Sequence, residues 1–170
     1  MNLSLVQRVN ANIIAKAKSH LGESEILDVN GNGINSGPEV DKYLAFVGLG
    51  PGYAWCAAFA SYVLHWTLLQ AGALPVESVL STASSHVAVN YGLAHNTHQT
   101  AQTAIPGDWL IERGGDGEQA KDGFSYHHTT MLVSINSSGI CKWIAGNTGD
   151  KVAYGSCRIS DCFILRPYVI

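Results

Sequence analysis

A cysteine at the start of an apolar, alanine-rich segment is the feature of this chain best suited to chemistry. Cys56 follows a turn at Pro51 and Gly52 and begins a run that is apolar through residue 60. A thiol in the first turn of a helix meets unpaired backbone N–H groups and the positive end of the helix dipole. Both favour the thiolate, the nucleophilic form of cysteine. The position therefore predicts a cysteine nucleophile.

A histidine and an asparagine later in the chain are candidate partners for this nucleophile. A cysteine nucleophile needs a base, and His128 lies at the start of a strand-like run. Asn147 follows within Gly-Asn-Thr-Gly and would orient the imidazole, although it could equally be a turn residue between glycines. Cys, His, Asn is the chain order of papain-like hydrolases. His127 is the rival base, because neighbouring strand residues face opposite sides.

A second pattern, over residues 28–39, predicts a calcium loop. This segment satisfies the calcium-loop spacing D-x-[DN]-x-[DN]-G-x5-E. The alternative is a cluster of Asn and Gly turn residues without an ion. The expected oxygen ligands are the side chains of Asp28, Asn30, Asn32 and Glu39 and the carbonyl of Ile34.

Composition restricts the class of protein. The chain has 170 residues, of which 46% are hydrophobic and 14% charged, so we expect a single folded domain over 1–170. A net charge of −3 gives no reason to expect nucleic acid as a partner, and no apolar run is long enough to span a bilayer. Residues 1–8 lack the pattern of a secretory signal. We therefore expect a protein made in the cytoplasm that reaches any outside target by another delivery route.

Four cysteines are too few for a disulfide scaffold in a chain of this length. With Cys56 kept as a nucleophile, at most one internal pair can form among Cys141, Cys157 and Cys162. Of these three, Cys157 and Cys162 are nearest to each other in sequence. The alternative is that all three are buried or surface thiols.

The pattern of elements predicts an α+β fold. Helices come first and a meandering sheet follows, so the nucleophile helix is expected to pack on an antiparallel sheet of about five strands. The predicted helices cover 2–21, 39–46, 55–70 and 81–93, and the predicted strands cover 108–112, 127–135, 140–145, 151–154 and 162–166.

With these residues in view, the chain resembles the CHAP family of cysteine, histidine-dependent amidohydrolases/peptidases. These are papain-like hydrolases of bacterial peptidoglycan, related to NlpC-type endopeptidases. The resemblance covers roughly residue 20 to the end of the chain. It is carried by 35–44 (NSGPEVDKYL), 51–59 (PGYAWCAAF), 106–108 (PGD), 128–129 (HT), 146–148 (GNT) and 165–167 (LRP).

The resemblance implies that Cys56 is the nucleophile and His128 the base. Asn147 matches the polar residue of the family's Glu-Gly-Asn segment, whose Glu is replaced here by Ala145. The role of orienting the His128 imidazole therefore falls on Asn147 alone.

A second departure from the family lies directly before the nucleophile. Trp55 stands where some relatives carry a polar residue that helps the oxyanion hole. That role would fall to the Cys56 backbone N–H and a side chain such as Tyr53, and we expect Tyr53 and Trp55 to contact the substrate. Some CHAP relatives bind calcium near the nucleophile, whereas the chemistry itself requires no cofactor.

The function implied is cleavage of an amide bond in the stem or cross-bridge peptide of peptidoglycan. Such an enzyme would act in the periplasm or cell wall, as an injected antibacterial effector with a cognate immunity protein or as a phage endolysin. One alternative is a catalytically inactive wall-binding or calcium-stabilised structural module. Another is a papain-like acyltransferase or peptidase that acts on other proteins.

Overall fold

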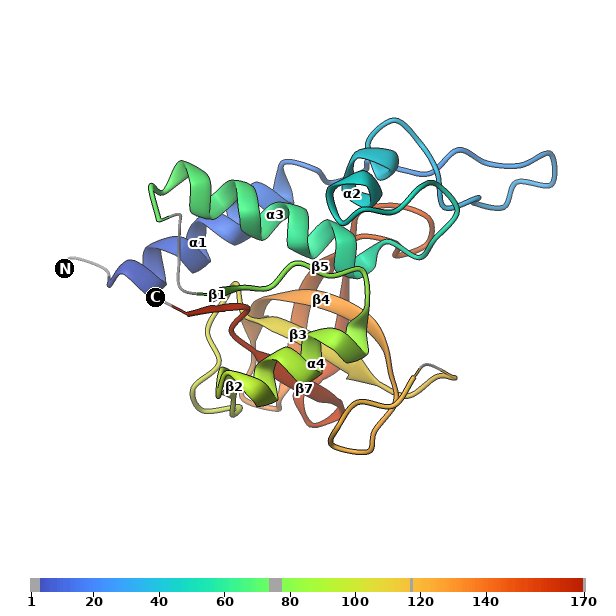
Figure 1. The fold of residues 1–170 in the computed structure, drawn as a ribbon. Helices are drawn as coiled ribbons and strands as arrows, with labels where there is room; N and C mark the ends of the chain where they lie inside the picture. The colour runs from blue at the N-terminus through green and yellow to red at the C-terminus, as the bar shows by residue number, and fades with distance from the viewer. Residues whose placement is uncertain (1–3, 74–77, 117, 170) are drawn as a thin grey trace.

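The computed structural model describes residues 4–73, 78–116 and 118–169, and its elements are shown in Figure 1. The helices are α1 (Leu5–Lys18), α2 (Val40–Phe46), α3 (Cys56–Gln70) and α4 (Ser85–Ala94), with a 3-10 turn η1 (Ile159–Asp161). The strands are β1 (Ser78–Val79), β2 (His98–Gln99), β3 (Trp109–Arg113), β4 (Tyr126–Ile135), β5 (Ile140–Ala145), β6 (Ala153–Arg158), β7 (Cys162–Leu165) and β8 (Tyr168–Val169).

The main sheet is antiparallel and has six strands in the order β2-β7-β3-β4-β5-β6, while β1 and β8 form a separate pair. This confirms the α+β prediction, with one strand more than expected because the short β2 pairs with β7. The strand predicted over 151–154 is wrong in position, since β6 runs over 153–158. Val152 instead exchanges backbone hydrogen bonds with Gly22 and Glu23.

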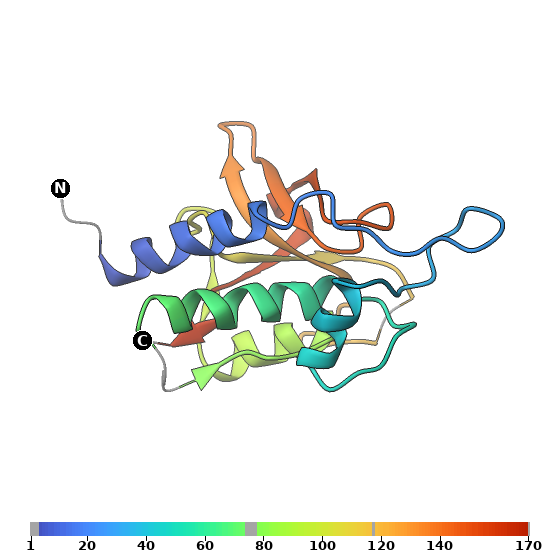
Figure 2. The same cartoon turned by 90° about the horizontal axis from the view of Figure 1, so that it is seen from above.

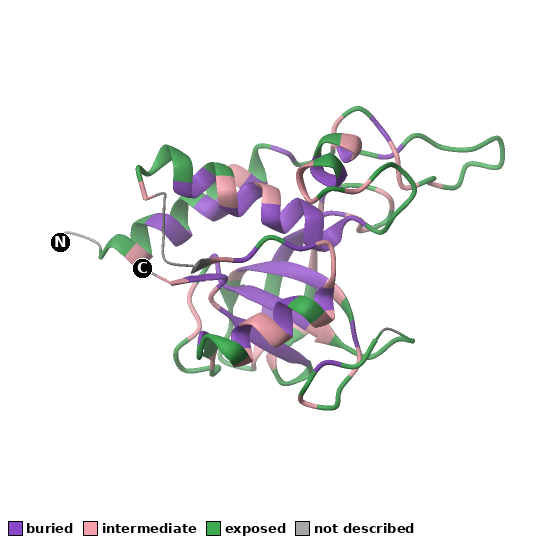
Figure 3. Cartoon of the chain, in the orientation of Figure 1, coloured by how far each residue is buried: buried purple, intermediate pink, exposed green. Residues whose placement is uncertain are grey.

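Three helices cover one face of this sheet. Figure 2 shows α1 and α3 side by side, and α4 lies against β3, β4 and β7. The main core fills the space between the helices and the sheet and is coloured purple in Figure 3. Among the described residues, no helix is both long and apolar enough to cross a membrane.

Helix α3 is the central element of this core. It is apolar on nearly every side, and residues 57–60 are fully buried. Its first backbone hydrogen bond runs from the Phe59 N–H to the Trp55 carbonyl, so the N–H groups of residues 56–58 are not used by the helix itself. Helix α1 begins at Leu5, where Ser4 and Gln7 form a capping box, and residues 2–3 of the predicted helix lie outside the described residues.

A second core lies on the opposite face of the sheet. It contains Leu132 of β4, Trp143 of β5 and Ile164 of β7. The sulfurs of Cys157 in β6 and Cys162 in β7 lie 3.3 Å apart, although these two strands are not neighbours in the sheet. The sheet therefore curls around this core. All four cysteines of the chain are free thiols in this structure.

Candidate active site

The segment that leads into α3 is held by a buried carboxylate. Trp55 is fully buried, and its indole N–H donates to Glu25 Oε1 at 2.7 Å. The other oxygen of Glu25 accepts the Asn35 backbone N–H at 2.6 Å. The structure therefore places Trp55 in the core rather than on a surface that a substrate could touch. The neighbouring Tyr53 is exposed and remains a candidate for substrate contact.

Cys56 is the first residue of α3 and only 6% of it is exposed. Burial raises the pKa of its thiol. The backbone N–H groups of Thr129 and Ala57 and the Ser85 hydroxyl oppose this rise, but desolvation is the larger effect. Desolvation therefore opposes the thiolate that the helix N-terminus was expected to favour, and the resting ionisation of Cys56 stays a prediction.

Two hydroxyl residues beside Cys56 were missed by the sequence interpretation. The Ser85 hydroxyl, at the first turn of α4, lies 2.9 Å from the Thr129 hydroxyl of β4. Both residues are buried, and both contribute a hydrogen bond that favours the Cys56 thiolate. No sequence signal marks Ser85, because its contact with β4 spans 44 residues of chain.

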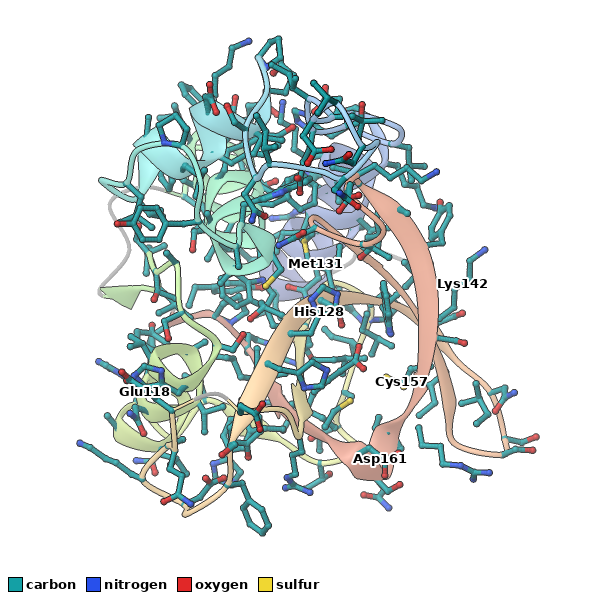
Figure 4. All side chains as sticks on the ribbon, turned by 90° about the vertical axis from the view of Figure 1, so that its right-hand side faces the viewer. Glu118, His128, Met131, Lys142, Cys157 and Asp161 are labelled. Atoms are coloured by element: carbon teal, nitrogen blue, oxygen red, sulfur yellow. The ribbon has the colours of Figure 1, made fainter. Side chains whose placement is uncertain are left out.

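His128 lies near the beginning of β4 and is labelled in Figure 4. Its ring meets the Trp143 ring edge-on, with centroids 5.5 Å apart. Its Nε2 lies 3.4 Å from the hydroxyl oxygen of Thr148. Burial, followed by the charge of neighbouring His127, lowers the pKa of His128 to about 4. The imidazole is therefore neutral at neutral pH and competent to accept a proton.

Thr129 directly follows His128 in β4. Its backbone N–H favours the thiolate of Cys56 and so opposes the rise in the pKa of that thiol. Among the described residues, no hydrogen bond joins the thiol to the imidazole itself. Direct proton transfer thus requires the imidazole and the thiol to approach further, as is common in structures without substrate.

His127, the rival base, has a different environment. It is exposed, and its ring lies near Gly115 and roughly parallel to the His128 ring, with centroids 6.4 Å apart. The ladder between β3 and β4 is irregular here, so that Glu112 pairs with His128 and Arg113 with Tyr126. His127 therefore has no register partner in β3 at this irregularity. Its role in the site is electrostatic, through the pKa of His128.

Asn147 lies in the loop between β5 and β6 and does not contact the imidazole by a hydrogen bond among the described residues. Its side-chain amide donates to Asn35 Oδ1 at 3.4 Å. Its φ is 56°, in the left-handed region that Asn tolerates in turns. The next residue, Thr148, is the one that reaches His128.

The predicted calcium loop forms an exposed turn with a bridge between Leu27 and Gly33. Asp28 Oδ1 accepts the backbone N–H groups of Asn30 and Asn32, which lowers the pKa of Asp28.

The remaining carboxylate of the pattern has a separate partner. Glu39 accepts a hydrogen bond from Lys42 Nζ at 2.6 Å, and Ile34 is exposed. Each carboxylate of the loop is thus engaged by the protein itself. In the described part of the chain, no group of three or more His, Cys, Asp or Glu residues is arranged to hold a metal. The calcium site stays a prediction from the sequence.

The fold is similar to that of NlpC/P60 domains. NlpC1 from Trichomonas vaginalis superposes with a TM-score of 0.51 at 16% identity, over 100% of this chain and 46% of that one. The P60 domain of a Mycobacterium avium subspecies paratuberculosis antigen gives 0.49 at 17% identity, over 98% and 100%. RipD from Mycobacterium tuberculosis, described as a non-catalytic NlpC/p60 domain protein adapted to peptidoglycan binding, gives 0.45 at 17% identity, over 94% and 98%.

At 16% identity, the superposition on NlpC1 shows a likeness of fold alone. No protein-family model matches the sequence, and no curated protein sequence matches it either. The chain therefore has a papain-like α+β fold of the NlpC/P60 kind, with a cysteine at the start of its central helix and a histidine on the adjoining strand.

Proposed function

We propose that the protein is a cysteine amidase or endopeptidase that cleaves an amide bond in the stem or cross-bridge peptides of peptidoglycan. The observation that carries the proposal is the Cys56 thiol at the start of α3, with its thiolate favoured by the backbone N–H of Thr129, the residue that directly follows His128. The substrate class rests on the resemblance of the sequence to CHAP hydrolases. The NlpC/P60-like fold supports the papain-like arrangement of the two residues.

The first chemical step is removal of the thiol proton. Because the Cys56 pKa is raised and the His128 pKa lowered, both groups are neutral before substrate binds. His128 accepts the proton from sulfur as the thiolate attacks the carbonyl carbon of the substrate amide. His128 therefore acts as a general base, rather than as the cation of a resting ion pair.

The attack places negative charge on the former carbonyl oxygen. The N–H groups of residues 56–58, which the helix does not use, are the available donors for this oxyanion. The protonated His128 then gives its proton to the leaving nitrogen, the carbon–nitrogen bond breaks, and a thioester on Cys56 remains. Water, deprotonated by His128, attacks the thioester and releases the carboxylic acid and the thiol.

The test is hydrolysis of purified cell walls. Wild-type protein should clear a wall suspension and release fragments with new amino and carboxyl ends, identified by mass spectrometry. Cys56→Ala and His128→Ala should each abolish clearing while retaining the circular dichroism spectrum. Cys157→Ala, which removes a thiol outside the site, should clear walls at the wild-type rate. Clearing by Cys56→Ala at the wild-type rate would refute the proposal.

A second candidate is a catalytically inactive module that binds the cell wall. Two observations favour it: the thiol is buried, which raises its pKa, and in the described chain no hydrogen bond joins it to His128. This alternative predicts that the wild-type protein sediments with purified walls but releases no fragments. Fragment release that depends on Cys56 would exclude it.

We further propose that the protein acts in the periplasm or cell wall after delivery, as an injected effector with an immunity protein or as an endolysin. Expression with an added periplasmic signal should then lyse bacteria, whereas cytoplasmic expression should not. Cys56→Ala in the same periplasmic vector is the matched control. Survival of cells that carry active protein in the periplasm would contradict this assignment.

A further inference from the structure

Thr148 makes the side-chain hydrogen bond that the structure records for the His128 imidazole. Its hydroxyl oxygen lies 3.4 Å from Nε2, near the upper limit for a hydrogen bond. Such bonds are often long in the absence of substrate and shorten when the reactive complex forms. The contact joins the loop between β5 and β6 to the start of β4, the two segments that carry the proposed base and its predicted partner.

Asn147, the residue expected to orient the His128 imidazole, makes its side-chain hydrogen bond to another residue. The Asn147 amide donates to Asn35 Oδ1, and the Asn35 backbone is held in turn by the buried Glu25. The left-handed backbone of Asn147 is part of the turn that presents the next residue to the imidazole. Asn147 therefore fastens the loop to residues 25–35.

The loop that carries Thr148 is fixed on several sides. The Thr148 N–H donates to the Lys151 carbonyl at 2.9 Å, and the Asp150 carbonyl accepts from the Glu25 N–H at 2.8 Å. Gly146 lies so close to the Trp55 ring that an added Cβ would be 2.5 Å from it. A well-anchored loop is what a residue needs in order to hold a second residue in one orientation.

Other neighbours of His128 do not supply this contact. Glu112 lies directly across the β3–β4 ladder, but its Oε1 is buried without a hydrogen-bond partner among the described residues. His127 is exposed, and Trp143 offers its ring edge to His128 rather than its indole nitrogen, which is also without a partner in the described chain.

We infer that Thr148, rather than Asn147, is the residue that positions the His128 imidazole. This inference rests on the proposed function. The Thr148 oxygen accepts the Nε2 proton, which fixes the tautomer with a bare Nδ1, so Nδ1 is the nitrogen that takes the proton from Cys56. A neutral hydroxyl, unlike a carboxylate, adds no charge that would make the imidazole more basic. This agrees with the low pKa of His128.

The test compares Thr148→Val, Thr148→Ser and Asn147→Ala. Thr148→Val should lower kcat about three- to ten-fold, the value of one neutral hydrogen bond, with KM unchanged. Thr148→Ser should recover most of this loss, and Asn147→Ala should lower kcat less than Thr148→Val does. Thr103→Val, a matched change in an exposed turn, should leave kcat at the wild-type value.

A second readout does not depend on activity. Nitrogen-15 NMR of labelled histidine should show the Nε2-protonated tautomer of His128 in the wild type and in Thr148→Ser, and a mixture of tautomers in Thr148→Val. If Thr148→Val keeps both kcat and the tautomer, the inference is overturned. If the wild type is inactive on cell walls but the tautomer still responds to Thr148, the proposed function fails while the positioning role stands.

Discussion

The backbone N–H of Thr129 lies near the Cys56 thiol and favours its thiolate, and Thr129 directly follows His128 in β4. Because this contact lies in a buried region, it does not suffice to ionise the thiol. The site thus combines a thiol whose pKa is raised with an imidazole whose pKa is lowered to about 4. Its ionisation states give predictions that differ from those for a resting thiolate–imidazolium pair.

The first prediction concerns thiol reactivity. Alkylation of Cys56 by iodoacetamide should be slow at neutral pH and should accelerate only above about pH 9, the ordinary thiol pKa, because burial raises the pKa of Cys56. Mass spectrometry of the peptide that contains Cys56 measures the rate separately from the other cysteines. A fast, pH-independent rate between acidic and neutral pH would indicate a resting ion pair instead.

The second prediction concerns the acid limb of activity. Since the pKa of His128 is lowered to about 4, the midpoint of the acid limb of kcat/KM should lie well below 6.5, the ordinary value for histidine. His127→Gln removes a charge that lowers this pKa, so it should move the midpoint to higher pH. The other titratable group facing His128 is Glu112, directly across the β3–β4 ladder. An unchanged or lower midpoint in His127→Gln would contradict this account.

The lowered pKa of His128 also makes the free energy of unfolding depend on pH. Between pH 6.5 and about pH 4 the folded protein binds fewer protons at His128 than the unfolded chain does. The free energy of unfolding should therefore decrease as the pH is lowered through this window. Urea unfolding across the window measures the effect, and His128→Gln should show a smaller decrease than the wild type.

The third prediction concerns Ser85. Ser85→Ala removes a hydroxyl that favours the Cys56 thiolate and leaves the buried Thr129 hydroxyl without this partner. The pKa of Cys56 should rise further, and the protein should lose about 1–3 kcal/mol of stability. Ser85→Thr keeps the hydroxyl and serves as the control. Equal alkylation profiles for wild type and Ser85→Ala would show that the hydroxyl has no influence on the sulfur.

The fourth prediction concerns the buried ion pair that ties the end of the chain to the sheet. The fully buried Asp108 carboxylate accepts two hydrogen bonds from Arg166, each at 2.9 Å, and one from Asn10 at 3.1 Å. Asp108→Ala leaves the guanidinium without its anion and should cost about 3–5 kcal/mol in urea unfolding. Adding Arg166→Met should recover part of this loss. If the double variant is no more stable than Asp108→Ala, the unpaired Arg166 charge is not the cause of the lost stability.

Local patterns in the sequence were sufficient to predict most elements. The apolar run after Cys56 predicted α3 to within a residue, and the polar turn after Ile135 predicted the start of β5 at Ile140. These predictions succeed because helix periodicity and turn composition depend on residues close together in the chain. The start of β6 was not predictable, because Val152 pairs with the backbone of residues 22–23, far away in sequence.

Residue types and local patterns were enough to predict which groups are available for chemistry: a cysteine at a helix start, a histidine on a following strand, and a polar loop after the next strand. The burial of these groups, their side-chain contacts and the direction of their pKa shifts follow from the fold as a whole. Burial of Cys56 raises the pKa of its thiol, and the loop after β5 presents Thr148 rather than Asn147 to His128. The physical reason is that desolvation and side-chain direction depend on segments that are distant in the chain and meet only when it folds.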